Sequence, residues 1–289
     1  MNSKNLSKMT LSQEDFGLVQ SMLSQRVGIS LAAGKEYLVV NRLSPLVDAF
    51  DFDSLHGLIQ SLNRGNNAQL WDEVVDVLAV HETSFFRDEA PFEQIEKEIL
   101  PGICRESRAT GRDIKIWSAG ASTGQEAYSI AILLSEIAPE LTGRVQIIGS
   151  DVSSKVLQTA SEGVYRKFEV SRGVNSERLE RFFEATQGAW RVKPNVRKMV
   201  QWEKFSLAGS WPSLPKFDLI LLRNVMVYFK PETRAGLLNR LTPLLKDSGR
   251  LVVGSAESLL AYDHRFKAIS SHNATHYILP QQTNLDSMN

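Results

Sequence analysis

The sequence predicts an α/β protein with a mainly parallel sheet, preceded by a small all-helical domain and interrupted by a small antiparallel β subdomain. Three observations lead to this fold class. Residues 11–80 carry apolar residues at helical spacing and no strand pattern. From Ile114 onwards, short apolar strands alternate with helices. Residues 163–200 break that alternation, which indicates an insertion.

The first domain is expected to begin with a helix at Ser12, which forms a capping-box pattern with Asp15. Apolar residues recur at helical spacing as far as Val27, and Gly28 fits a left-handed C-cap. Further helices are expected in three stretches, 34–49, 53–62 and 67–79. Pro45 is expected to interrupt the first of these three, because proline cannot donate a helical hydrogen bond.

A connecting segment, 81–112, is expected to hold a longer helix that begins at Asp88 and ends near Gly111. The α/β domain, 113–280, then carries strands at 114–117, 145–148, 217–222 and 251–253, with helices at 124–137, from Ser153, and at 231–245. Continuous apolar strands are typical of a parallel sheet covered on both faces. The inserted subdomain is expected to be an antiparallel excursion built from 165–170, a short helix at 176–185, and 190–192.

Composition narrows the function classes. Among 289 residues, 33 basic side chains balance 33 acidic ones, so net charge gives no reason to bind nucleic acid or a membrane surface. The single cysteine, Cys104, cannot form an internal disulfide, and no histidine pattern suggests a metal site. No signal peptide or membrane-spanning stretch is apparent. We expect a cytoplasmic protein without a metal.

A loop of small residues follows the strand at 114–117. In this loop Gly120 allows a tight turn and a close approach of a ligand to the backbone. The loop fits neither the dinucleotide fingerprint nor the P-loop, and no lysine follows to hold phosphates. Glu126 would attract a cation such as the ammonium of an amino acid. The alternative is that Glu126 only compensates the charge at a helix N-terminus.

Asp151 directly follows the second strand, where an acidic side chain can accept hydrogen bonds from both ribose hydroxyls. The alternative is that it caps the helix that starts at Ser153. Together with Glu126, it suits a ligand with a ribose and an aminoacyl group but no phosphates. S-adenosylmethionine fits that description.

Two further segments point to the same cleft. Arg223 and Asn224 follow the apolar strand at 217–222, with Tyr228 close behind, although Tyr228 could be an ordinary core residue. The segment 81–88 places two phenylalanines beside Thr83 and Arg87, between the helical and α/β parts. The phenylalanines could equally be core, and the arginine could belong to a surface ion pair.

These segments together resemble the CheR family of chemotaxis receptor methyltransferases. The resemblance is carried by ETSFFRD (82–88), SAGASTGQEAYS (118–129), SDVS (150–153), EGVYR (162–166), FDLILLRNVMVYF (217–229) and LLKDSGRLVVGSAESL (244–259). It implies a Rossmann-like S-adenosylmethionine-dependent methyltransferase that esterifies glutamate side chains in the cytoplasmic domain of a methyl-accepting chemotaxis receptor and releases S-adenosylhomocysteine. The resemblance also implies the residues around the cofactor: His81, Thr83, Arg87, Gly120, Glu126, Asp151, Ser206, Leu207, Arg223 and Asn224. Arg87 and Tyr228 are implied to be the residues nearest the transferred methyl group.

The chain departs from the family pattern at two site positions, where His81 and Ser206 replace the more usual asparagine. Residues 183–190 are short and contain one glycine, whereas relatives that tether to a receptor-tail pentapeptide carry a glycine-rich stretch there. We therefore expect no pentapeptide tethering. The helix at 34–49 carries only Lys35 and Arg42 as basic residues, so we expect weaker or different receptor docking. No heptad or large apolar stripe suggests an oligomer, and a monomer is expected.

Two other functions compete with this one. A methyltransferase of the same fold could act on another protein or on a small molecule. Alternatively, the chain could bind the cofactor as a sensor without transferring the methyl group, for which His81 and Ser206 are the only support in the sequence. A serine hydrolase is disfavoured, because the sequence around Ser122 lacks a nucleophile elbow and suggests no histidine–acid pair nearby.

Overall fold

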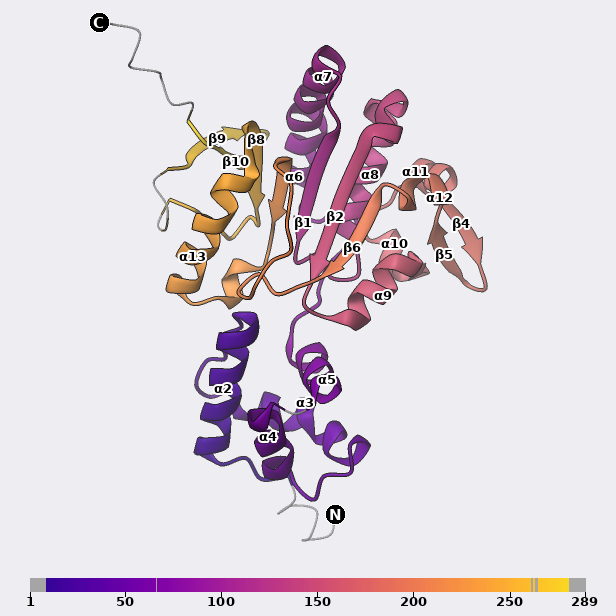
Figure 1. Ribbon diagram of the computed structural model, residues 1–289. Helices are drawn as coiled ribbons and strands as arrows, with labels where there is room; N and C mark the ends of the chain where they lie inside the picture. Colours follow the sequence, from indigo (N-terminus) through magenta and orange to yellow (C-terminus); the bar gives the residue numbers. More distant parts are fainter. Residues whose placement is uncertain (1–8, 66, 261, 263–264, 281–289) are drawn as a thin grey trace, which may run out of the picture.

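The computed structural model describes residues 9–65, 67–260, 262 and 265–280. Their central feature is a seven-stranded sheet with the strand order β6-β2-β1-β7-β8-β10-β9 (Figure 1). Five strands run parallel: β1 (Ile114–Ala119), β2 (Val145–Asp151), β6 (Val200–Lys204), β7 (Phe217–Leu222) and β8 (Leu245–Val253). An antiparallel hairpin of β9 (Lys267–Ser271) and β10 (Ala274–Ile278) completes one edge. The predicted α/β fold class is confirmed.

Helices cover both faces of this sheet, as the continuous apolar strands predicted. On one face Ile114 and Ile116 pack in a core with the helices that precede and follow β1. These helices are α6 (Glu89–Gln94), the π-helical turn η1 (Ile95–Ile99), α7 (Leu100–Thr110) and α8 (Gln125–Ile137). On the other face Trp117 packs in a second core with α13 (Pro231–Leu241). The alternation along β1 therefore separates the two cores.

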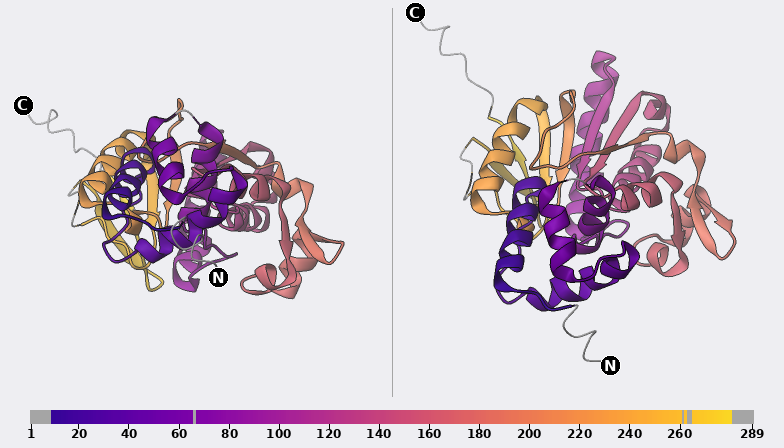
Figure 2. Two further views of the ribbon diagram at one scale, coloured as in Figure 1. Left: turned by 90° about the horizontal axis from the view of Figure 1, so that it is seen from below. Right: turned by 60° about the horizontal axis from the view of Figure 1, so that its bottom comes forward.

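The N-terminal domain has its own core and lies at the carboxyl edge of the parallel strands (Figures 1 and 2). Its helices are α2 (Gln13–Val27), α3 (Glu36–Ala49), α4 (Leu55–Arg64) and α5 (Ala68–Leu78). Ser12 caps α2 by accepting from the amide of Asp15, and Gly28 ends α2 with φ 80°. The expected interruption at Pro45 is wrong, because α3 continues through it. Its neighbours Leu46 and Val47 are buried, and this packing holds the helix together.

The inserted subdomain is a three-stranded antiparallel sheet in the order β3-β5-β4, drawn at the right of Figure 1. Its strands are β3 (Val164–Arg166), β4 (Phe183–Thr186) and β5 (Ala189–Val192), and its helices are α10 (Lys167–Ser171) and α11 (Ser176–Phe182). The predicted piece at 165–170 is thus strand at 165–166 and helix at 167–170, and the helix predicted at 176–185 ends three residues early. After it come α12 (Pro194–Arg197) and then β6 of the main sheet.

Several boundaries differ from the prediction because pairing partners and proline decide them. The helix expected at 231–245 ends at Leu241. A 3-10 turn, η4 (Thr242–Leu244), follows it and contains Pro243, and β8 then begins at Leu245. The sequence pattern alone does not predict strands β6, β9 and β10. The remaining elements are η2 (Pro139–Arg144), α9 (Ser154–Glu162) and η3 (Met226–Tyr228). None of the helices in the described ranges is long and apolar enough to cross a membrane.

The subdomain supports the segment that joins the two domains. Phe85 is 1% exposed, and its ring makes edge contacts with Tyr165 and Phe183, at centroid distances of 5.0 and 5.3 Å. The loop between α10 and α11 lies so close that a Cβ atom on Gly173 would overlap the carbonyl oxygen of Phe85. Contacts from the inserted subdomain therefore hold the segment around Phe85 in place.

We expect Gly173→Ala to lower the free energy of unfolding by about 1–3 kcal/mol, the usual cost of overpacking a tight contact. Gly143→Ala is the matched control, because Gly143 is exposed and a Cβ atom there would meet nothing within 4 Å. That control should stay within about 0.5 kcal/mol of the parent in urea denaturation. Equal stability of the two variants would show that the contact at Phe85 yields without cost.

Candidate functional site

A cavity of about 300 Å³ lies between the N-terminal domain and the carboxyl edge of the sheet. Its walls come from the loop after α2, from the first half of α3, from residues 78–87, and from the loops that follow β1, β2, β6 and β7. The structure brings ten of the predicted site residues to this cavity: His81, Thr83, Arg87, Gly120, Glu126, Asp151, Leu207, Arg223, Asn224 and Tyr228. Ser206 is not among the lining residues.

The loop after β1 is held against the end of β2. The amides of Gly120 and Ala121 both donate to the carbonyl of Ser150, at 2.8 Å each. Gly120 has φ 79°, and a Cβ there would lie 2.5 Å from Val225, so only glycine fits. The hydroxyl of Ser122 donates to the carbonyl of His81 at 2.8 Å, which ties this loop to the segment between the domains.

Asp151 organises the backbone at the end of β2. One carboxylate oxygen accepts from the amide of Ser122 at 2.9 Å, and the other accepts from the amide of Ser153 at 3.1 Å. The cap of α9 is Ser153 itself, whose hydroxyl accepts from the amide of Val156. Burial raises the pKa of the Asp151 carboxyl, while the two amides and the nearby His81 oppose the rise. Asp151 is thus a partly desolvated acceptor at the cavity wall.

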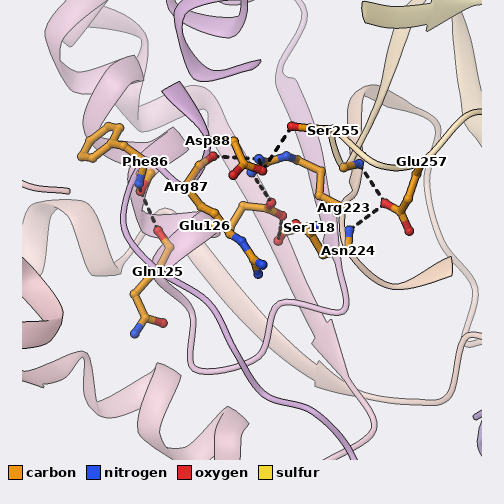
Figure 3. Close-up of polar contacts among 12 residues, drawn as sticks. Phe86, Arg87, Asp88, Ser118, Gln125, Glu126, Arg223, Asn224, Ser255 and Glu257 are labelled. Atoms are coloured by element: carbon orange, nitrogen blue, oxygen red, sulfur yellow. Dashed lines mark hydrogen bonds and ion pairs between the residues drawn. The ribbon is translucent and has the colours of Figure 1, made fainter. Parts of the chain in front are cut away.

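Glu126 is fixed by two polar partners in the first turn of α8 (Figure 3). One oxygen accepts from the hydroxyl of Ser118 at 2.7 Å, and the other accepts from Arg223 at 3.1 Å. The helix-terminus interpretation and the ligand-binding interpretation are compatible, since the carboxylate both begins a helix and lines the cavity.

Arg223 is the most deeply buried charge at the site, with its side chain 1% exposed. Besides Glu126, its guanidinium donates to Asp88 at 3.0 Å and to the carbonyl of Arg87 at 2.7 Å. It also stacks over Phe92, 5.2 Å from the ring centre. Arg223 therefore joins the end of β7, the start of α8 and the segment between the domains (Figure 3).

The segment 81–88 divides its side chains between core and cavity. Phe85 belongs to the core, and the amide of Phe86 donates to the hydroxyl of Ser129 at 3.0 Å. Arg87 lines the cavity and donates to the carbonyl of Glu82 at 2.8 Å. Within the ranges that the structure describes, no carboxylate pairs with Arg87, so the alternative of a surface ion pair is not supported.

The two positions that depart from the family pattern are used locally. The Nε2 atom of His81 lies 3.0 Å from the carbonyl of Asp76 at the end of α5, so this ring nitrogen is the donor. The hydroxyl of Ser206 accepts from the amide of Ala208 at 3.2 Å within its own loop. His81 also lines the cavity. Ser206 does not, but its neighbour Leu207 does.

Tyr228 lies where the two domains meet. The amide of Ser30 donates to the Tyr228 carbonyl at 2.8 Å, and Ile29 and Phe229 form an antiparallel bridge. Asn224, at the other end of this loop, has φ 59°. Glu257 holds the loop from the opposite side, accepting from the amide of Asn224 at 2.7 Å. The sequence alone assigned Glu257 no role, although it falls within the last matching segment, 244–259.

Comparison with known proteins gives matches over nearly the whole described chain. Residues 14–79 match the family model for the CheR methyltransferase all-alpha domain, and residues 81–275 match that for the CheR methyltransferase SAM binding domain. The chemotaxis protein methyltransferase of Vibrio parahaemolyticus is 37% identical, covering 91% of this chain and 96% of that protein. The chemotaxis protein methyltransferase 1 of Pseudomonas aeruginosa is 36% identical over 87% and 92% of the two chains. The Escherichia coli chemotaxis protein methyltransferase is 30% identical over 90% and 89%.

We expect Arg223→Met to destabilise the fold by about 3 kcal/mol, because it leaves the carboxylates of Glu126 and Asp88 without their buried cation. Arg105→Met is the control, since Arg105 is exposed on α7 and should change stability by less than about 0.5 kcal/mol. Thermal and urea unfolding of both variants measure the difference. If Arg223→Met is as stable as the control, the guanidinium does not hold the three elements together.

Proposed function

The chain belongs to the CheR methyltransferase family, and we propose that it esterifies glutamate side chains in the cytoplasmic domain of a methyl-accepting chemotaxis receptor. The observation that carries the proposal is the cavity itself, which joins two fixed carboxylates, Glu126 and Asp151, to Arg87 and Tyr228. The relatives that match over most of their length are chemotaxis protein methyltransferases, which supports the same substrate class.

The donor groups at the cavity suit S-adenosylmethionine. Each carboxylate oxygen of Asp151 accepts a hydrogen bond from one backbone amide. Each oxygen can accept a further bond, so the carboxylate can also bind two ribose hydroxyls. Glu126 lines the wall as an acceptor for the cofactor's ammonium, and Gly120 lets the backbone approach closely. His81, Thr83, Leu207, Arg223 and Asn224 also line the wall, and Arg223 in addition holds Glu126 in place. We assign Ser206 to its loop, where it supports Leu207 from the neighbouring position.

The proposed chemistry requires positioning more than proton transfer. When bound, S-adenosylmethionine supplies an electrophilic methyl group on a sulfonium. A glutamate side chain has an ordinary pKa of about 4.3, so it is ionised at neutral pH and needs no general base. Opposite charges cancel as the bond forms, so a site that aligns the partners and excludes water favours the reaction.

Two residues of the chain are proposed to handle the incoming carboxylate. Arg87 lines the cavity with one nitrogen bonded to the carbonyl of Glu82, which leaves other guanidinium donors for a carboxylate. Tyr228 can donate one hydrogen bond that orients the attacking oxygen. One carboxylate oxygen must stay free of Arg87, because a tight ion pair on both oxygens would weaken the nucleophile.

We further propose a cytoplasmic monomer that recognises its receptor without a tail tether. The strands β4 and β5 are joined by Gln187 and Gly188 alone, and both have positive φ, as a tight hairpin turn requires. This leaves no glycine-rich extension to hold a receptor tail. In the N-terminal domain, Arg42 donates to the carbonyls of Val77, Leu78 and Ala79. This leaves Lys35, which is exposed at the N-cap of α3, as the basic side chain of this segment for docking.

The proposed reaction is tested with labelled S-adenosylmethionine and a receptor cytoplasmic domain. Methyl esters release methanol in alkali, whereas N- or C-methyl groups keep the label. We expect Tyr228→Phe to lower kcat by about tenfold, equivalent to one hydrogen bond, with little change in cofactor affinity. Arg87→Ala should lower kcat/KM by at least as much. Cofactor binding without any transfer by the wild-type protein would favour a sensor and contradict the proposal.

The raised pKa of Asp151 predicts a pH-dependent affinity. A protonated carboxyl loses acceptor capacity, so binding of S-adenosylhomocysteine should weaken as the pH falls through that raised pKa, which begins at a higher pH than for an ordinary aspartate. Below it, affinity should fall about tenfold per pH unit. In calorimetry, Asp151→Asn should bind weakly at neutral pH and lose this dependence. The same pH profile in wild type and variant would assign it to another group.

A further inference from the structure

We propose that Glu257 is a positioning residue for the loop 223–228, holding its backbone so that Asn224 and Tyr228 face the cavity. The inference rests on the proposed function, because it concerns the loop that carries Tyr228. Glu257 itself is not among the cavity-lining residues, so it acts through the loop and not by touching a ligand.

The carboxylate of Glu257 accepts three backbone amides. One oxygen takes that of Asn224 at 2.7 Å (Figure 3). The same oxygen takes that of Gly254 at 2.8 Å, and the other oxygen takes that of Val227 at 3.2 Å. Strand β7 ends at Leu222, so the amides of the loop have left the sheet ladder and need other partners. Hydrogen bonds to an ionised carboxylate are stronger than those between neutral groups. The carboxylate of Glu257 thus supplies acceptors for backbone amides that have no partner strand.

The loop turns sharply at Asn224. Its φ of 59° lies in the left-handed region, which asparagine adopts more readily than most residues with a side chain. From the other side, Ser30 of the N-terminal domain donates to the carbonyl of Tyr228. Glu257 and the N-terminal domain therefore hold the loop from opposite sides, in addition to the contacts of Arg223 at its start and of Arg234 with the Val227 carbonyl. Loss of the Glu257 carboxylate releases the loop amides while these other attachments remain.

A substitution at Gly254 offers a second, independent way to disturb the same contact. A Cβ atom at this position would lie 2.7 Å from the bonded oxygen of Glu257 and 2.9 Å from the amide nitrogen of Asn224. Such contacts are far inside van der Waals distance, so Gly254→Ala must push the carboxylate and the loop apart. This substitution disturbs the contact while leaving Glu257 in place.

Hydrogen exchange tests the backbone contact without relying on activity. In Glu257→Ala and in Gly254→Ala, the amides of Asn224 and Val227 should lose protection, while those of β7 keep theirs. Glu232→Gln and Gly236→Ala are the matched controls, since both residues are exposed on α13 and nothing lies within 4 Å of a Cβ at Gly236. Wild-type protection of the loop amides in both test variants would overturn the proposal, whether or not the protein transfers methyl groups.

A double-mutant cycle then tests the consequence for the reaction. Tyr228→Phe should lower kcat about tenfold in the wild-type background but less than about threefold in Glu257→Ala, because the hydroxyl is already misplaced there. Affinity for S-adenosylhomocysteine should fall less than kcat does, since most cavity-lining residues lie outside the loop. Equal factors for Tyr228→Phe in both backgrounds would overturn the positioning role. No effect of Tyr228→Phe in the wild type would instead remove Tyr228 from the proposed function.

Should Glu257→Ala fail to fold, Glu257→Gln keeps the test open. Its amide oxygen can still accept from Asn224 and Gly254, but its NH₂ group faces the amide of Val227, which is also a donor. We expect intermediate loop protection and a smaller loss of kcat. Full wild-type protection at Val227 and unchanged kcat in this variant would contradict the proposal.

Discussion

The site depends on one constraint, that the backbone amides beyond the carboxyl edge of a parallel sheet have lost their ladder and must find other acceptors. In this protein, carboxylates meet much of that need. Asp151 accepts from the amides of Ser122 and Ser153, and Glu257 accepts from those of Asn224, Val227 and Gly254. Each carboxylate therefore fixes a loop, and together they set the shape of the cavity wall on both sides of β1.

Carboxylates used in this way concentrate negative charge in a poorly hydrated region. A buried cation must balance that charge. Arg223 does this for Glu126 and Asp88, and its burial at 1% exposure is tolerated because it contacts both carboxylates. Asp151 lies instead against amides and His81, and burial raises its pKa. Acidic and basic side chains thus both line the cavity, with Glu126 and Asp151 on the sheet side and Arg87 on the segment between the domains. Such a mixed lining suits a ligand that carries both an ammonium and a carboxylate group.

Local sequence signals predicted the features that local chemistry decides. The cap at Ser12, the C-cap at Gly28 and the turn at Gly120 each follow from a few neighbouring residues. Contacts between distant segments could not be found in this way. Pro45 was wrongly expected to interrupt α3, since packing in the N-terminal core overrides its local effect. The contact between Glu257 and the amide of Asn224 joins residues 33 positions apart, and no spacing rule reports it.

The N-terminal domain is part of the site and not an appendage to it. Ile29 pairs with Phe229, and the amide of Ser30 bonds to the carbonyl of Tyr228, so the loop that carries Tyr228 is completed by the other domain. The approach is close, because a Cβ at Gly28 would lie 2.9 Å from the ring of Phe229. The domain held in this way forms one side of the cavity, with apolar residues such as Ile29 and Leu38 in its wall. Since desolvation favours a reaction in which opposite charges cancel, docking of the N-terminal domain contributes directly to the chemistry that the cavity can support.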